Sequence, residues 1–154
     1  MKRKAAKPRT SEHQEQVALF QWADTMKHRW PELGLMYANV NAGKRSYAMA
    51  NWYKAEGLRS GVPDLFLPCA RGVWFGFFCE MKAGKNKVSP EQRRWLNLLG
   101  DAGYFCVVCW SAEQAIERLT DYLNMPLTCV LNAKAAPQVA ARAADEALGS
   151  IGRK

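Results

Sequence analysis

The stretch from Val73 to Cys79 consists almost entirely of apolar residues, which on a strand occupy both faces. A strand that is buried on both sides lies inside a sheet and has helices packed over it. Apolar periodicity before and after this stretch indicates such helices. The chain therefore predicts an α/β domain with residues 73–82 as its central strand.

Serine caps and changes in hydrophobic period place the other elements. Ser11, Ser89 and Ser111 each stand three residues before a glutamine, which is the spacing of a capping box at a helix N-terminus. Helices are expected at residues 11–30, 46–57, 89–103 and 111–123, and strands at 35–40, 65–67, 73–82 and 104–110. The apolar stripe predicted for the third helix consists of Trp95, Leu98, Leu99 and Ala102.

Charge and composition divide the chain into three parts. Residues 1–10 form a basic arm, which either lies along phosphates or only solubilises the chain. Residues 11–125 hold the periodic elements, and residues 126–154 form an alanine-rich appendage. The net charge of +8 favours a polyanionic partner. Because no apolar run approaches the roughly 20 residues that span a bilayer, we expect an intracellular protein with no membrane segment.

Five cysteines are present, but their context does not indicate a disulfide framework. Cys106 and Cys109 form a Cys-x-x-Cys on an expected strand, where positions three apart face opposite sides. They therefore do not converge on a zinc ion, and we predict that they pack as small hydrophobic side chains.

Two acids and a lysine lie where expected strands begin or end. Strand alternation puts Glu80 and Lys82 on one face, and Asp64 begins the neighbouring strand. Two carboxylates repel each other unless a cation lies between them, and such hard oxygen ligands suit Mg²⁺ or Mn²⁺. A lysine beside that cation can orient water or stabilise charge on a phosphate. The alternative is a solvated strand end, with Asp64 as a turn residue after Pro63.

Further motifs extend this pattern along the chain. In order, they are Ser11-Glu12-His13-Gln14-Glu15-Gln16, Asn41-Ala42-Gly43-Lys44-Arg45, Gly61-Val62-Pro63-Asp64, Glu80-Met81-Lys82 and Ser89-Pro90-Glu91-Gln92. Together they resemble the PD-(D/E)XK nuclease superfamily, and most closely its VRR-NUC branch, over about residues 11–124. The resemblance implies a restriction-endonuclease-like core, in which a mixed central sheet is flanked by helices in the order αβββαβ plus a C-terminal helix.

The resemblance also implies roles for single residues. Asp64, Glu80 and the backbone carbonyl of Met81 are the expected metal ligands, and Lys82 is the expected catalytic lysine. Two assignments stay open. Gln92 matches an active-site glutamine of the family, but its spacing is also that of a helix cap. Glu12 fits the family's first-helix glutamate better, with Glu15 as the other candidate. The expected nucleic-acid contacts are Lys44, Arg45, Lys85 and Lys87.

The function implied by the resemblance is a Mg²⁺- or Mn²⁺-dependent, structure-selective DNA endonuclease, similar to Holliday-junction resolvases. Its expected substrate is branched or flapped DNA, and its expected state is a homodimer in the cytoplasm of a bacterium or a phage-infected host. Recognition of DNA shape is favoured over base sequence because one catalytic domain leaves little room for a specificity module. The alternative is a DNA-binding protein without catalytic activity.

Overall fold

A computed structural model of the chain describes residues 11–39 and 47–127. The basic arm, Lys44, Arg45 and almost all of the alanine-rich appendage lie outside these residues. Along the described chain the elements are α1 (Glu12–Met26), η1 (Pro31–Leu35), β1 (Tyr37–Ala38), α2 (Tyr47–Ala55), β2 (Leu65–Leu67), β3 (Phe77–Met81), α3 (Pro90–Asp101), β4 (Phe105–Cys109) and α4 (Ala112–Leu123).

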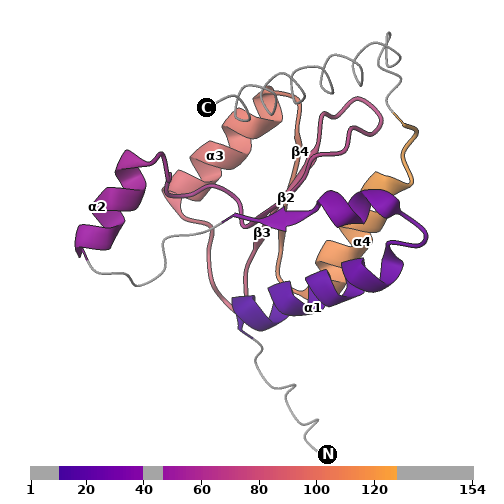
Figure 1. The fold of residues 1–154 in the computed structure, drawn as a ribbon, viewed down its shortest axis with the longest axis horizontal. Coiled ribbons are helices and arrows are strands. Elements are labelled where there is room, and N and C mark those ends of the chain that lie inside the picture. Colours follow the sequence, from indigo (N-terminus) through magenta and orange to yellow (C-terminus); the bar gives the residue numbers. More distant parts are fainter. Residues whose placement is uncertain (1–10, 40–46, 128–154) are drawn as a thin grey trace, which may run out of the picture.

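The four strands form one mixed sheet in the order β1-β2-β3-β4 (Figure 1). The pairs β1–β2 and β2–β3 are antiparallel, whereas β3 and β4 are parallel, with Phe77 opposite Phe105 and Met81 opposite Cys109. The predicted α/β class and the central position of the Glu80-containing strand are therefore confirmed.

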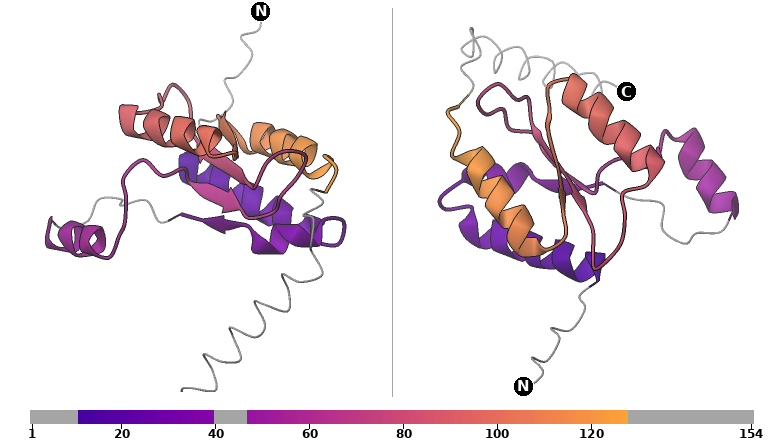
Figure 2. Two further views of the ribbon diagram at one scale, coloured as in Figure 1. Left: turned by 90° about the horizontal axis from the view of Figure 1, so that it is seen from above. Right: turned by 180° about the vertical axis from the view of Figure 1, so that it is seen from behind.

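Helices cover both faces of the sheet (Figure 2). Phe77, Cys79 and Met81 of β3 are fully buried on the face that α1 and α4 cover, and the ring of Phe77 packs on that of Tyr122 from α4. The opposite face of β3 carries Glu80, which is hydrogen-bonded to Gln92 of α3. The strand alternation predicted for β3 thus separates the core face from a face that carries Phe78, stacked on Phe66, and then Glu80; we call the latter the polar face after Glu80.

The helix starts follow the predicted caps. Ser11 and Ser89 form complete capping boxes with Gln14 and Gln92, and the Ser111 side chain accepts the N–H of Gln114. Each of these contacts is local, since it joins residues three apart, and for that reason the sequence indicates them directly.

Three predictions about strands and burial were wrong. The central strand begins at Phe77 instead of Val73, because residues 71–74 form a tight turn closed by Arg71 and Trp74. Within residues 35–39 the structure has a strand at Tyr37–Ala38 only, since a 3₁₀ helix starting at Pro31 extends to Leu35; Val40 lies outside the described residues. Leu98 does not point to the core: its side chain is 53% exposed, and no residue of α3 is buried.

Cysteine packing follows the prediction for most of the described thiols. Cys69, Cys79 and Cys109 are buried in the core, while Cys106 on the edge strand β4 is half-buried. Among the described residues, no helix has the length and apolar character needed to cross a membrane.

α2 stands apart from the rest of the molecule (Figure 1). It packs against no other helix or strand of the described chain, and Trp52 at its centre is 67% exposed. Its C-terminal end leads through Gly57 and Gly61 back to β2, so this excursion ends beside the polar face of the sheet.

Candidate active site

Asp64 is held at the entrance to β2 by contacts on both sides. The backbone N–H of Asn39 donates to the Asp64 carbonyl, and the Asn39 side chain donates to the carbonyl of Pro63, each at 2.7 Å. The Oδ2 atom of Asp64 accepts the backbone N–H of Met81 at 2.7 Å. This bond crosses from β2 to β3 and fixes the Asp64 carboxylate next to the end of the central strand.

Glu80 and Lys82 form a buried pair on the polar face of β3. Glu80 is completely buried, and Lys82 is 5% exposed. The Lys82 ammonium donates to Oε1 of Glu80 at 2.6 Å. A charged pair at this depth is costly unless further contacts satisfy it. The alternative of a solvated strand end is therefore inconsistent with the structure.

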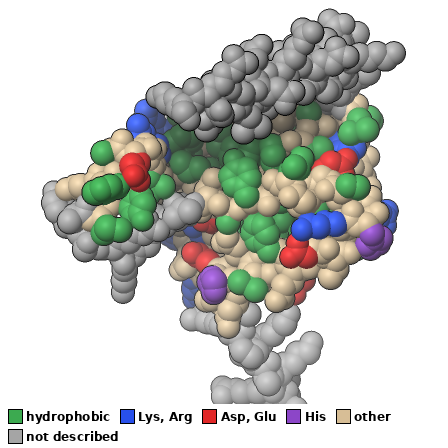
Figure 3. Space-filling view, viewed as in Figure 1, with side chains coloured by type: hydrophobic (Ala, Val, Ile, Leu, Met, Phe, Trp, Pro, Cys, Tyr) green, Lys and Arg blue, Asp and Glu red, His purple; other side chains and the backbone are tan. Residues whose placement is uncertain are grey.

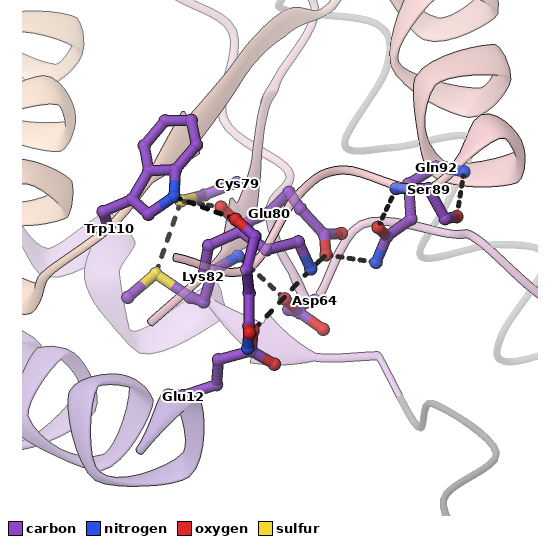
Figure 4. A network of polar contacts seen from close by, with 10 residues as sticks. Glu12, Asp64, Cys79, Glu80, Lys82, Ser89, Gln92 and Trp110 are labelled. Atoms are coloured by element: carbon purple, nitrogen blue, oxygen red, sulfur yellow. Dashed lines mark hydrogen bonds and ion pairs between the residues drawn. The ribbon is translucent and has the colours of Figure 1, made fainter. Parts of the chain in front are cut away.

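Gln92 serves both as a helix cap and as a partner of Glu80 (Figure 4). Its Oε1 atom accepts the N–H of Ser89 at 2.9 Å, which closes the capping box of α3. Its Nε2 group donates to Oε1 of Glu80. The two interpretations of Gln92 that the sequence left open are therefore compatible, because opposite ends of one amide make the two contacts.

Glu12 and Glu15 occupy different places although both lie in the first turn of α1. Oε1 of Glu12 lies 4.0 Å from the Lys82 ammonium. Oε2 of Glu15 instead accepts the backbone N–H of Ala112 at the start of α4, at 2.7 Å. Of the two glutamates, Glu12 is the one whose carboxylate approaches the Glu80–Lys82 pair (Figure 4).

Asn86 and Trp110 belong to this site but were missed in the sequence. Asn86 donates from Nδ2 to Oε1 of Glu12 at 2.9 Å, and its carbonyl accepts the indole N–H of Trp110 at 3.3 Å. These bonds join residues 74 and 24 positions apart, so no local pattern indicates them. They hold the loop between β3 and α3 against α1 and the end of β4.

Burial controls the ionisation of both acids. It raises the pKa of Asp64, although the Met81 N–H and the Lys82 ammonium oppose this effect. Burial also raises the pKa of Glu80 to about 7, where the hydrogen bond from Lys82 opposes it and the charge of Asp64 adds to it. Two acids that resist ionisation side by side favour a bound cation, which would offset their mutual repulsion.

The donors present fit a hard divalent cation. Oε2 of Glu80 is buried and has no hydrogen-bond partner among the described residues, although Oε1 has two. No cluster of three His, Cys, Asp or Glu side chains suited to a metal occurs in residues 11–39 and 47–127. Mg²⁺ commonly takes one or two carboxylates and leaves its other positions to water and substrate phosphate. Asp64 and Glu80, with the carbonyl of Met81, match that requirement.

The predicted nucleic-acid contacts are only partly within the described chain. Lys85 and Lys87 are exposed on the loop between β3 and α3. Lys85 also lines a hollow of about 510 Å³ together with Glu12 and Asn86. Lys44 and Arg45 lie outside the described residues, so their prediction is unchanged.

Comparison with known proteins gives one family and one fold. The model of the VRR-NUC domain family matches residues 8–113, which is more than half of the chain. A solved structure described as a VRR_NUC domain protein superimposes with a TM-score of 0.67 at 24% identity, covering 76% of this chain and 91% of the other. No curated protein matches.

Proposed function

The chain belongs to the VRR-NUC family of nucleases, and from that premise we propose that it is a divalent-metal-dependent DNA endonuclease. The observation that carries the proposal is the buried Glu80–Lys82 pair next to Asp64, in which one oxygen of Glu80 has no hydrogen-bond partner among the described residues. We further propose Mg²⁺ or Mn²⁺ as the metal, held by Asp64, Glu80 and the carbonyl of Met81.

The residues around this pair suit phosphodiester hydrolysis. A bound cation supplies a Lewis acid for the phosphate and lowers the pKa of a coordinated water. The Lys82 ammonium and the Gln92 amide both donate to Oε1 of Glu80. Lys82 is therefore positioned to orient the nucleophile or to stabilise charge on the phosphate. Glu12 and Gln92 hold Lys82 and Glu80 from two different helices. Such preorganised charges act without reorganising during the reaction.

The proposed substrate is branched or flapped DNA, cut by a homodimer. The described chain is one α/β unit, and the proposed site residues that are described lie on its core elements or the loops that join them. It presents no separate module for reading bases among residues 11–39 and 47–127, which favours recognition through backbone geometry.

The proposal is tested by offering the purified protein linear duplex, single strands, flaps and four-way junctions, with Mg²⁺ and Mn²⁺ in turn. We expect cleavage of the branched substrates, and we expect EDTA to stop it. Asp64→Ala and Lys82→Ala should each remove cleavage while the circular dichroism spectrum stays that of the wild type. DNA binding without cleavage under all conditions would favour the non-catalytic alternative, and full activity in the Asp64→Ala variant would reject this site.

A further inference from the structure

Two adjoining hollows lie along α3, next to the site but outside it. One, of about 310 Å³, lies between the turn at Arg59 and Ser60 and the helix. The other, of about 480 Å³, continues along the exposed side of α3 past Arg93. They share Arg94 and Leu98, and we name the continuous surface the α3 groove. From its charge and position we propose that the α3 groove binds the phosphates that flank the cleaved bond of a nucleic-acid strand.

The charge of the α3 groove fits a polyanion. Arg59, Arg93 and Arg94 are all exposed, whereas the described residues that line the groove include one carboxylate, that of Glu91. None of the three arginines forms an ion pair with a carboxylate within residues 11–39 and 47–127. Arg59 uses one N–H to reach the carbonyl of Lys54, at 3.3 Å, and a guanidinium carries five such donors. Figure 3 shows basic side chains where α2 and the residues next to it meet the rest of the molecule.

Helix stability does not explain these arginines. Arg93 and Arg94 follow Gln92 directly and lie in the N-terminal half of α3, where the helix dipole disfavours cations. Glu91 precedes Arg94 by three residues, a spacing that allows an ion pair, but the two form none within residues 11–39 and 47–127; Arg93 has no acid three or four positions away. Leu98 adds an exposed apolar surface to the same groove. An exposed apolar surface between guanidinium groups is suited to a sugar–phosphate chain, which has both apolar and anionic parts.

The groove is rigidly connected to the site. The indole N–H of Trp95 donates to the carbonyl of Ser60 at 2.9 Å, which holds the turn carrying Arg59 against α3. Gly61 follows at φ +84°, and a Cβ there would lie 2.7 Å from the backbone carbon of Glu91. Asp64 follows Gly61 by three residues, so the close contact between Gly61 and α3 also places Asp64 near this helix. Gln92 of the same helix contacts Glu80. A strand bound at Asp64 and Glu80 therefore continues directly into the α3 groove.

This inference rests on the proposed function, and its test separates the two. Binding of a fluorescein-labelled flap substrate is measured in EDTA over a range of salt concentrations, for wild type and Arg59→Ala/Arg94→Ala. We expect the Kd of the double variant to rise roughly tenfold or more. The slope of log Kd against log salt should fall by about one for each phosphate that the variant no longer binds. A matched control removes two charges elsewhere, with Arg29→Ala/Arg118→Ala.

The control residues lie away from the groove. Arg29 is exposed and stacks on the ring of Trp30 at 4.4 Å, and Arg118 is on α4, across the sheet from α3. Both double variants should keep the wild-type circular dichroism spectrum. Arg59→Ala/Arg94→Lys should regain part of the affinity that Arg59→Ala/Arg94→Ala loses. If wild type binds and cleaves but both double variants match it in Kd and slope, the inference is wrong and the proposed function stands. If wild type neither binds nor cleaves DNA, both fail.

A second readout uses the DNA instead of the protein. Single phosphates on either side of the cleaved bond are replaced by neutral methylphosphonates, and wild type is compared with Arg59→Ala/Arg94→Ala. We expect wild-type binding to weaken when the replaced phosphates lie on one side of the cleaved bond, and to stay unchanged when they lie on the other side. The weakening should be smaller for the double variant. Equal reductions in affinity for the two proteins at every position would overturn the inference.

Discussion

Glu15 of α1 accepts the first backbone N–H of α4, that of Ala112, at 2.7 Å. The contact places a carboxylate at the positive end of a helix dipole and joins the two helices on the apolar side of the sheet. It also uses Glu15 in a structural contact, whereas Glu12, almost one turn earlier, lies 4.0 Å from Lys82. Two glutamates that the sequence could not separate therefore have different surroundings.

Replacing each glutamate by glutamine should separate their roles. We expect Glu15→Gln to lower the free energy of unfolding by about 1 kcal/mol, because it removes the charge at the helix N-terminus. Its cleavage rate should stay that of the wild type at temperatures where it is folded. Glu12→Gln should lower kcat with little change in urea stability. The reverse pattern in paired denaturation and cleavage assays would contradict this division.

Gln92 and Gln14 provide a matched pair, because both close a capping box but only Gln92 reaches Glu80. Gln14→Ala should lose about 0.5 to 1.5 kcal/mol of stability through the missing capping bond, and Gln92→Ala should lose more, because buried Glu80 also loses a donor. Gln92→Ala should in addition lower kcat roughly tenfold or more, since it also removes a hydrogen bond to a charged group. Equal kcat values in the two variants would assign Gln92 to capping alone.

Gly61 should tolerate substitution less well than Gly57. Both have positive φ, of +84° and +100°, but only at Gly61 would a Cβ meet other atoms, with the Glu91 backbone carbon at 2.7 Å. Gly57→Ala should cost about 1 kcal/mol for the backbone conformation. Gly61→Ala should cost at least twice as much and should also impair cleavage, because the loop carrying Asp64 must move from α3. Chemical denaturation of the two variants measures the difference, and equal losses of stability would show that backbone conformation alone matters.

Glu80 should make the metal-free protein less stable as the pH rises. Its pKa of about 7 in the folded chain lies above its ordinary value of 4.5, so the folded state holds the extra proton between these values. The free energy of unfolding should therefore fall as the pH increases from about 4.5 through 7. Asp64, whose pKa is also raised by burial, adds to this trend, while Lys82 and Glu12 are the other charged groups that face Glu80.

Urea denaturation in EDTA at several pH values measures this dependence. Glu80→Gln should flatten most of it, because the amide does not ionise. Mg²⁺ should bind more tightly above pH 7 than below, since a ligating carboxylate must lose its proton first. Stability that rises with pH between 5 and 7 in the wild type, or an unchanged profile in Glu80→Gln, would be inconsistent with the environment of Glu80.

Local interactions explain why much of this protein could be predicted from its sequence. The serine caps with their glutamines, the turn at Gly61 and Pro63, and the alternation along β3 involve neighbours within a few residues, so their physical effect is visible in the order of amino acids. The α/β class, the starts of α1, α3 and α4, and the shared face of Glu80 and Lys82 follow from such contacts. The predicted beginning of the central strand was wrong, because the turn at Arg71 and Trp74 interrupts the apolar run; Gly76, directly before the observed start at Phe77, is a break in that run that the prediction did not use.

Contacts between residues far apart required the folded chain. Four features depend on which helix packs where: the separation of Glu12 from Glu15, the recruitment of Asn86 and Trp110, the exposure of Leu98, and the Glu80 oxygen that has no partner among the described residues. Burial and pairing are properties of three-dimensional neighbours, and a linear pattern specifies which residue types are available but not the partners that each one meets. The residue types needed for metal-dependent chemistry are thus evident from the chain, and their assembly into one site is a consequence of packing.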